Sequence, residues 1–237
     1  MNSVINALGQ PIGFAVPNWT ARPRPPQTPM EGKFCRVVPL NIEQHAMDLY
    51  QANSKDAEGR MWTYLGYGPF TTFEHYLAEM NRWTAEDWHI HAIISAKSCQ
   101  AEGLASYVSI EPEAGSIEVG AIMYSPGLQR SAAGTEAMYL MMKRAFDELG
   151  YRRYVWRCNA LNERSMNAAK RLGFRFEGIF RQATVLKGRN RDTAWLSITD
   201  QEWLVIKEAF ECWFSLDNFD ARGQQIKSLR EFCRTEK

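Results

Sequence analysis

The chain has 237 residues, 45% of them apolar, which is the size of one globular domain with terminal extensions. Its 28 basic and 27 acidic residues leave a formal charge of +1, which argues against a nucleic-acid binder or a protein held on an acidic membrane surface. The sequence shows no membrane-spanning apolar stretch and no apolar signal segment, and its five cysteines lack a C-x-x-C pair. We therefore expect a soluble cytoplasmic protein with reduced thiols and no metal site.

The first 32 residues are expected to form a proline-rich extension. Six of the ten prolines fall within the first 29 residues, and the run Arg22-Pro23-Arg24-Pro25-Pro26 excludes regular helix and central strand there. Such a segment is either an extended strap or loose tail beside the domain, or a polyproline arm that docks on a partner. We place the folded domain at residues 33–214 and a C-terminal tail at 215–237, with a candidate helix at 224–233.

The first half of the domain mixes helices with strands. A strand pattern at residues 34–38 precedes a helix capped by Asn41, and Thr71 with Glu74 three residues later predicts the cap of a second helix. Three strand-like runs follow, at residues 89–95, 104–110 and 116–124. Their short connections predict an antiparallel meander.

The second half begins with a helix, because after Pro126 the apolar period changes from two to 3.6. Met138, Met142, Ala145 and Leu149 share one helix face, and Gly150 stands where a helix stop belongs. The remaining elements are a strand at 154–158, a helix at 162–172, a hairpin of strands 175–186 and 193–198, and a last helix capped by Thr199 and Glu202. The order predicts an α+β fold.

The segment at residues 126–137 is the first chemical signal. It reads Pro-Gly-Leu-Gln-Arg-Ser-Ala-Ala-Gly-Thr-Glu-Ala and joins a strand to the long helix. Unpaired backbone N–H groups and the positive end of a helix dipole meet there, so the small residues from Ser131 to Gly134 would let a phosphate approach closely. The alternative is an ordinary turn before a helix that starts with small residues.

Two motifs together resemble those of a known family. Gln129-Arg130-Ser131-Ala132-Ala133-Gly134 resembles the Q/R-x-x-G-x-G/A pyrophosphate loop of the GNAT superfamily of acetyl-CoA-dependent N-acetyltransferases. The run from Asn159 through Asn162 and Ser165 to Gly173-Phe174 resembles the branch that acetylates ribosomal-protein amino termini. The resemblance covers residues 33–200. It implies a mixed, mostly antiparallel twisted sheet whose central strand pair splays apart between flanking helices.

The resemblance also implies a cofactor site. Acetyl-CoA would lie between the splayed strands at 116–124 and 154–158, with its diphosphate on the loop. The implied cofactor-binding residues are Met123, Gln129, Arg130, Ser131, Ala132, Ala133, Gly134, Thr135, Asn159 and Asn162. Asn162 serves equally well as a plain helix cap. Ala132 replaces the usual glycine, which costs stability only if its φ is positive.

The candidate catalytic residues are Ser165, which the resemblance implies, and Glu118, which is chosen for its place on the strand that faces the cleft; the alternatives are a plain first-turn serine and an exposed glutamate paired with a neighbour. Most members place a tyrosine where this chain has Ala169, and the similar branch instead uses a serine at the position of Ser165 to protonate the leaving thiolate. The carboxylate proposed as base in that branch is here Thr184, which leaves Glu118 or a chain of waters to take the proton from the amine. His89 and His91 alternate along a strand, and we expect structural roles for them.

The amine acceptor is expected to meet the aromatic loop at residues 59–70. Trp62, Tyr64 and Tyr67 would wall the amine site, and the same side chains also suit a core plug between the two N-terminal helices. The acceptor would be a peptide or protein N-terminus, or a small-molecule amine. A different class of function, a degenerate member that binds acyl-CoA or a peptide without turnover, is suggested by Ala132, Ala169 and Thr184. The sequence does not indicate an oligomeric state.

Overall fold

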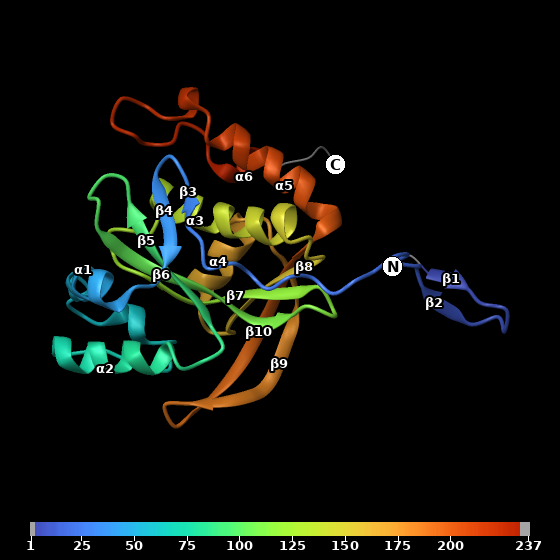
Figure 1. Cartoon of the computed structure of the whole chain (residues 1–237), viewed down its shortest axis with the longest axis horizontal. Helices are drawn as coiled ribbons and strands as arrows, with labels where there is room; N and C mark the ends of the chain where they lie inside the picture. The colour runs from blue at the N-terminus through green and yellow to red at the C-terminus, as the bar shows by residue number, and fades with distance from the viewer. Residues whose placement is uncertain (1–2, 233–237) are drawn as a thin grey trace.

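An eight-stranded sheet runs through the computed structural model, which describes residues 3–232 (Figure 1). The strand order is β3-β4-β5-β6-β7-β8-β10-β9. The strands are β3 (Met30–Glu31), β4 (Cys35–Pro39), β5 (His89–Ser95), β6 (Ala101–Glu111), β7 (Ser116–Tyr124), β8 (Arg153–Asn159), β9 (Arg175–Leu186) and β10 (Arg189–Thr199). Every neighbouring pair is antiparallel except β7 with β8, which confirms the mixed, mostly antiparallel α+β fold.

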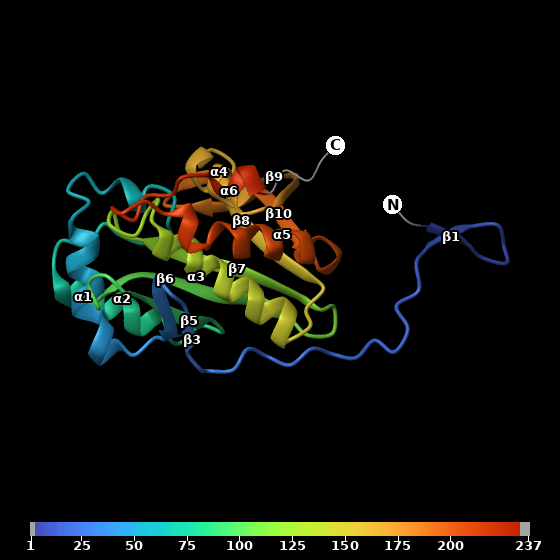
Figure 2. The ribbon, with the colours of Figure 1, turned by 90° about the horizontal axis from the view of Figure 1, so that it is seen from above.

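Helices cover both faces of the sheet (Figures 1 and 2). They are α1 (Ile42–Ser54) and α2 (Phe73–Trp83) on one face, and α3 (Ala132–Lys143), α4 (Glu163–Arg171) and α5 (Asp200–Trp213) on the other. The two faces have separate apolar clusters, and β5 shows why, since Ile90 and Ala92 belong to the first and Ile93 to the second. No helix among residues 3–232 is both long and apolar enough to cross a membrane.

The helix ends follow local sequence signals, with one correction. Asn41 caps α1 by accepting a hydrogen bond from Gln44 N, and Thr199 with Glu202 forms the capping box of α5. The cap of α2 is Thr72, whose hydroxyl accepts from His75 N, so the prediction of Thr71 was wrong by one residue. Gly150, with φ +69°, follows the π-helical turn Arg144–Glu148 that ends α3.

The parallel pair β7 and β8 separates part of the way along. Ladder pairing joins residues 116–119 of β7 to residues 153–156 of β8 and goes no further. Residues 120–124 of β7 remain paired with β6, and residues 157–159 of β8 with β10. We call residues 120–124 and 157–159 the strand fork. Ala121, with φ +47°, lies where the β6–β7 register shifts, so the chain bends away at the fork.

The N-terminal extension contains more structure than expected. β1 (Ser3–Ile5) and β2 (Pro11–Gly13) form a separate hairpin that projects from the body (Figure 2). Residues 14–34, which we call the strap, connect this hairpin to β4. Within the strap, β3 joins the main sheet by pairing with β4. The side chain of Arg144 donates hydrogen bonds to the carbonyl oxygens of Thr28 and Pro29, which fixes the strap beneath α3.

The C-terminal tail contributes two short helices, at Leu216–Asn218 and at α6 (Leu229–Phe232), where Leu229 is buried. Of the candidate helix at 224–233, the described residues form helix only at 229–232, and Cys233 lies outside them. Cys35, Cys99, Cys158 and Cys212 are free thiols.

Candidate active site

Ser165 and Glu118 lie on opposite faces of the sheet where the strand fork begins. Glu118 pairs with Val155, and the next pair, Val119 with Trp156, is the last of the ladder. Successive strand residues face opposite sides, so Trp156 points away from the Glu118 face. Its indole N–H donates to Ser165 Oγ over 3.0 Å, which puts Ser165 on the far side. A group held in the fork therefore has one of these side chains on each side.

The first turn of α4 positions Ser165. Its backbone N–H donates to Asn162 Oδ1 over 3.1 Å, so Asn162 is the helix cap. Because Ser165 Oγ accepts the indole hydrogen bond, its own proton is free to be donated elsewhere. Burial raises the pKa of the neighbouring Cys158 thiol, and a hydrogen bond with Ser165 opposes that rise. Ser165 therefore lies beside the Cys158 thiol with a hydroxyl proton that the indole hydrogen bond does not use.

Glu118 is a buried carboxylate held by one cation. It forms an ion pair with Arg157, which also donates to Ser109 Oγ over 2.7 Å and lies over the Trp195 ring at 4.9 Å. Burial raises the pKa of Glu118, while the hydrogen bond and charge of Arg157 act against that rise. Such a carboxylate accepts a proton more readily than an exposed glutamate. It lines an open cavity of about 620 Å³.

The positions that differ from the family pattern offer no substitute groups. Ala169 lies on the buried side of α4, in the core, and its methyl group supplies no hydroxyl. Thr184 lies exposed on β9 opposite Arg191, and its side chain carries no carboxylate. The described residues contain no group of three or more His, Cys, Asp or Glu side chains gathered as metal ligands.

The loop between β7 and α3 exposes several backbone donors. Ser131 caps α3 by accepting a hydrogen bond from Gly134 N over 2.9 Å, and Gln129 Nε2 donates to Tyr124 O over 2.8 Å. The backbone N–H groups of Arg130, Ala132 and Ala133 have no acceptor within residues 3–232. These groups meet at a helix N-terminus, which is the arrangement that binds phosphate.

The small residues of this loop have different roles. A Cβ on Gly134 would lie 2.6 Å from Leu128 O and 2.9 Å from a Tyr124 ring carbon, so packing against β7, and not only phosphate approach, requires glycine here. Ala132 has no positive φ and is the first residue of α3, so its methyl group causes no backbone strain. Thr135 is buried, and its hydroxyl donates to Ser131 O and accepts from Arg171 over 2.5 Å. Thr135 therefore supports the loop from beneath.

The other implied cofactor residues offer backbone or amide groups. The Met123 side chain is buried under α1, where its sulfur accepts from Asn53 Nδ2, so only its backbone is open to the fork. Asn159 Oδ1 accepts from Leu161 N over 2.9 Å, and Asn162 Oδ1 caps α4. The side-chain NH₂ groups of both asparagines have no hydrogen-bond partner within the described part of the chain.

The aromatic loop is mainly a core plug between α1 and α2. Trp62 is buried with ring centroids 5.2 Å from Phe70 and 6.3 Å from Tyr67, and burial raises the pKa of Tyr67. Tyr64 is half-buried and donates its hydroxyl to Leu161 O over 3.0 Å. This bond ties the loop to the turn that precedes α4, so the loop reaches from the α1–α2 face to the β8 side of the fork.

Lys187 makes a contact with the aromatic loop that sequence reasoning missed. It stands in the two-residue turn between β9 and β10, where Lys187 and Gly188 both have positive φ. Its ammonium donates to the carbonyl oxygens of Trp62, Tyr67 and Gly68 over 3.1, 3.1 and 2.9 Å. The hairpin tip is thereby fastened to the aromatic loop. The sequence signalled only the turn, because these partners lie about 120 residues away.

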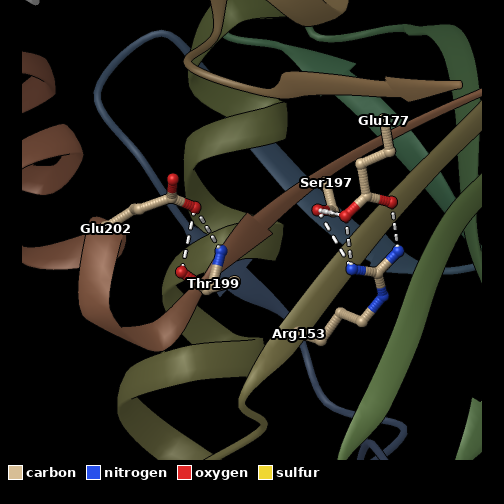
Figure 3. A network of polar contacts seen from close by, with 5 residues as sticks. All are labelled: Arg153, Glu177, Ser197, Thr199 and Glu202. Carbon is tan, nitrogen blue, oxygen red and sulfur yellow. Dashed lines mark hydrogen bonds and ion pairs between the residues drawn. The ribbon is translucent and has the colours of Figure 1, made fainter. Parts of the chain in front are cut away.

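A polar network holds the closed end of the fork. Figure 3 shows Arg153, at the start of β8, bound by the carboxylate of Glu177 on β9 over 2.7 and 2.5 Å and by Ser197 on β10. Arg153 lowers the pKa of Glu177. Beside it, Thr199 and Glu202 form the α5 capping box (Figure 3). Three strands are thus cross-linked where β7 and β8 are still paired.

Comparison with known proteins agrees with this geometry. The sequence family described as "Acetyltransferase (GNAT) domain" matches residues 36–175. A GCN5-related N-acetyltransferase from Brucella melitensis is 42% identical, with a TM-score of 0.89 over 92% of this chain and 99% of its own. A probable GNAT-family acetyltransferase from Chromobacterium violaceum is 36% identical, with a TM-score of 0.76 over 82% of this chain and 97% of its own.

A more distant likeness concerns the fold alone. A protein from Vibrio cholerae, assigned provisionally as a ribosomal-protein-serine acetyltransferase, is 14% identical, with a TM-score of 0.60 over 74% of this chain and 99% of its own. No curated protein matches the sequence. With a family match over more than half its length and a relative at 42% identity, the chain belongs to the GNAT acetyltransferases, which transfer acetyl groups from acetyl-CoA.

Proposed function

We propose that the protein transfers the acetyl group of acetyl-CoA to a primary amine while both substrates are bound at the strand fork. The observation that carries this proposal is the position of Ser165 and Glu118 on opposite faces of the sheet where the β7–β8 ladder ends. A thioester in the fork would have a hydroxyl donor on one side and a carboxylate on the other. Such a pair of groups can take the proton from the amine and protonate the leaving thiolate.

The cofactor would enter the fork as an additional strand does. Residues 120–124 and 157–159 have no ladder partner across the fork, so their edges are free to bind the amide groups of the pantetheine arm. The diphosphate would bind the loop from Gln129 to Thr135, where three backbone N–H groups are free at the start of α3. Asn159 and Asn162 would contribute their free NH₂ groups from the β8 side.

The reaction would proceed by direct attack. The amine nitrogen bonds to the thioester carbonyl carbon as Glu118, directly or through water, takes the ammonium proton. The C–S bond then breaks, and the thiolate receives the Ser165 proton while a water molecule reprotonates Ser165, which gives the amide and free CoA. Glu118 returns the proton taken from the amine to solvent, so both side chains regain their starting protonation states. Arg157 would keep Glu118 ionised until the amine arrives, since its charge opposes the rise in pKa that burial causes.

The acceptor is either a peptide or protein N-terminus or a small-molecule amine. The Asn162 and Ser165 motif supports the first choice, because it resembles the ribosomal-protein branch. Trp62, Tyr64 and Tyr67 would form the wall on the α1–α2 side. Their packing is that of a rigid plug, so they would shape the site and not close around the amine.

The second candidate is a degenerate member that binds acyl-CoA or a peptide without turnover. Ala169 and Thr184 still favour it, since neither supplies the acid or base of the family pattern. Ala132 no longer does, because it lies in helical backbone without a positive φ.

A paired experiment separates these functions. Acetyl-CoA at about 100 times its Kd should stabilise the fold by about 2.7 kcal/mol, measured as a shift in thermal unfolding. A panel of peptide N-termini and small amines should then give free thiol only with the right acceptor. Stabilisation without thiol release from any acceptor supports the degenerate alternative, and no stabilisation by millimolar acetyl-CoA overturns both.

A further inference from the structure

The N-terminal hairpin has an apolar surface that its own domain does not cover. Figures 1 and 2 show β1 and β2 standing away from the body at the end of the strap. Every residue of the two strands is exposed. The large apolar side chains of the hairpin are between 48% and 82% exposed: Val4, Ile5, Leu8 and Ile12. Phe14, which follows the hairpin, instead packs on the domain, where the Arg152 guanidinium lies 5.8 Å from its ring. Residues 3–18 contain no charged side chain.

The strap holds the hairpin away from its own domain. Trp19 is fixed on the β6–β7 turn, where its indole N–H donates to Glu113 O over 2.8 Å. The guanidinium groups of Arg22 and Arg152 lie 4.4 and 5.7 Å from the centre of its ring. Three residues later, Arg22 N donates to Pro112 O over 3.0 Å. We call the β1–β2 hairpin the arm. Because the chain is anchored at Trp19 and Arg22, the arm is directed outward from this end of the molecule.

The hairpin is ordered by its own bonds but is too small to be stable alone. Val4 lies opposite Ile12, and Asn6 Oδ1 accepts from the backbone N–H groups of Leu8 and Gln10, both over 2.9 Å. An isolated two-stranded hairpin is marginally stable in water. A segment with this shape and an uncharged, apolar surface is typical of an arm that docks on something else.

The same chain carries a second uncovered apolar surface, at the edge strand β9. Within residues 3–232, β9 pairs only with β10, so its outer edge of backbone groups is open. Phe176, Ile179, Phe180 and Val185 are between 46% and 72% exposed. Ile179 lies opposite Ala194 and Phe180 opposite Thr193, so the apolar side chains occupy both faces of the strand. An exposed edge of this kind invites pairing with another strand.

We propose that two copies of this chain associate by exchanging arms, with the β1–β2 hairpin of each copy added to the β9 edge of the other. A strand added at the β9 edge places its own side chains beside those of β9 on both faces of the sheet, so it covers the apolar residues on each face. A partner packed against one face would cover only half of them. Pro11 removes a backbone donor from β2, so β1 is the strand that pairs. Reciprocal exchange forms two such contacts, consistent with the closed symmetry of most homo-oligomers.

A second copy fits these observations better than a membrane surface. The hairpin has no Lys or Arg to bind anionic headgroups, and its residues form strands with open backbone edges, which apolar lipid does not satisfy. The β9 edge supplies both the backbone partners and the apolar contacts.

The test is the oligomeric state of the full chain, measured by light scattering after gel filtration across a range of concentrations. The wild type should be a dimer. Ile12→Asp on the hairpin and Val185→Asp on β9 should each give monomers with unchanged thermal unfolding of the monomeric domain. Leu204→Asp, at an equally exposed apolar residue on α5, is the matched control and should remain a dimer.

Mixing the two monomeric variants gives a sharper result. The Val185→Asp chain keeps an intact arm and the Ile12→Asp chain an intact β9 edge, so an equimolar mixture should form a weaker heterodimer through one exchange. A monomeric wild type overturns the proposal, as does a dimer that survives Ile12→Asp. Binding of the monomeric wild type to phosphatidylcholine vesicles, lost in Ile12→Asp, would assign the arm to membranes and also overturn it.

Discussion

Replacing Ser165 with alanine removes the hydroxyl that accepts the Trp156 indole hydrogen bond and that would donate a proton in the proposed reaction. The Trp156 indole N–H, in a buried ring, loses the acceptor that it has at 3.0 Å, and a buried donor without an acceptor costs about 1–3 kcal/mol of stability. The proposed reaction loses the group that protonates the leaving thiolate. We expect kcat to fall about 10- to 1000-fold, while the Kd for acetyl-CoA changes little because no diphosphate contact involves Ser165.

A matched variant separates the structural effect from the catalytic one. Trp156→Phe removes the indole donor but leaves the Ser165 hydroxyl and its helix in place. It should lose comparable stability, yet its kcat should fall less than about tenfold, since the proton donor is still present. Comparing the two variants at a temperature where both are folded removes unfolding from the measured rates.

The assay is steady-state release of free thiol with the best acceptor, together with the Kd for acetyl-CoA from calorimetry. A Ser165→Ala enzyme with wild-type kcat would refute the reasoning, because the thiolate would then leave without this donor. Equal losses of kcat in Ser165→Ala and Trp156→Phe would refute it as well, since Ser165 would act only through the local structure.

Three further predictions concern Glu118, Lys187 and His91. The rate should fall at acid pH as Glu118 is protonated, and because burial raises its pKa the fall should begin at a higher pH than the pKa of an ordinary glutamate would give. Glu118→Gln should abolish this acid limb of the kcat/KM profile. Arg157→Met should move the limb to higher pH, because it removes the charge that opposes the rise in pKa. A wild-type profile in Glu118→Gln would assign the proton to water. Lys187→Met removes three hydrogen bonds to the aromatic loop, so it should raise the KM for the acceptor and speed proteolysis within residues 59–70. An unchanged KM and an unchanged proteolysis rate would show that Lys187 does not hold the loop in place. His91 is buried with a pKa lowered to about 4, so the unfolded chain binds a proton that the folded chain does not, and the free energy of unfolding should fall by about 2 kcal/mol from pH 7 to pH 5. Urea unfolding measures this, and His91→Gln should remove most of the pH effect.

Local patterns in the sequence predicted most of the main sheet and its helices. The bounds of β5, β7 and β9 agree with the strand patterns at 89–95, 116–124 and 175–186, because alternation of side chains is a property of the strand itself. The caps at Asn41 and Thr199 were predicted because a helix cap depends on residues within three positions of it. Thr71 and Thr72 are adjacent and chemically alike, so sequence alone chose the wrong one.

Sequence alone could predict only those parts of the candidate site whose residues are close together along the chain. The loop at residues 129–135 and the turn that carries Ser165 are each built from consecutive residues, so their motifs identified both segments. The partner of Glu118 and the three acceptors of Lys187 come from other elements, and no local pattern encodes them. The role of Gly134 was also hidden, since its closest contact is the carbonyl of Leu128, brought near by the turn. The projecting hairpin was missed because a proline-rich segment suggests extended chain.

The structure of a complex with CoA tests the central claim most directly. The account predicts that the CoA sulfur lies in the strand fork within hydrogen-bonding distance of Ser165 Oγ, on the side opposite Glu118, with the diphosphate on the free N–H groups at the start of α3. A CoA molecule whose sulfur lies outside the fork, or whose diphosphate avoids this loop, would contradict the account.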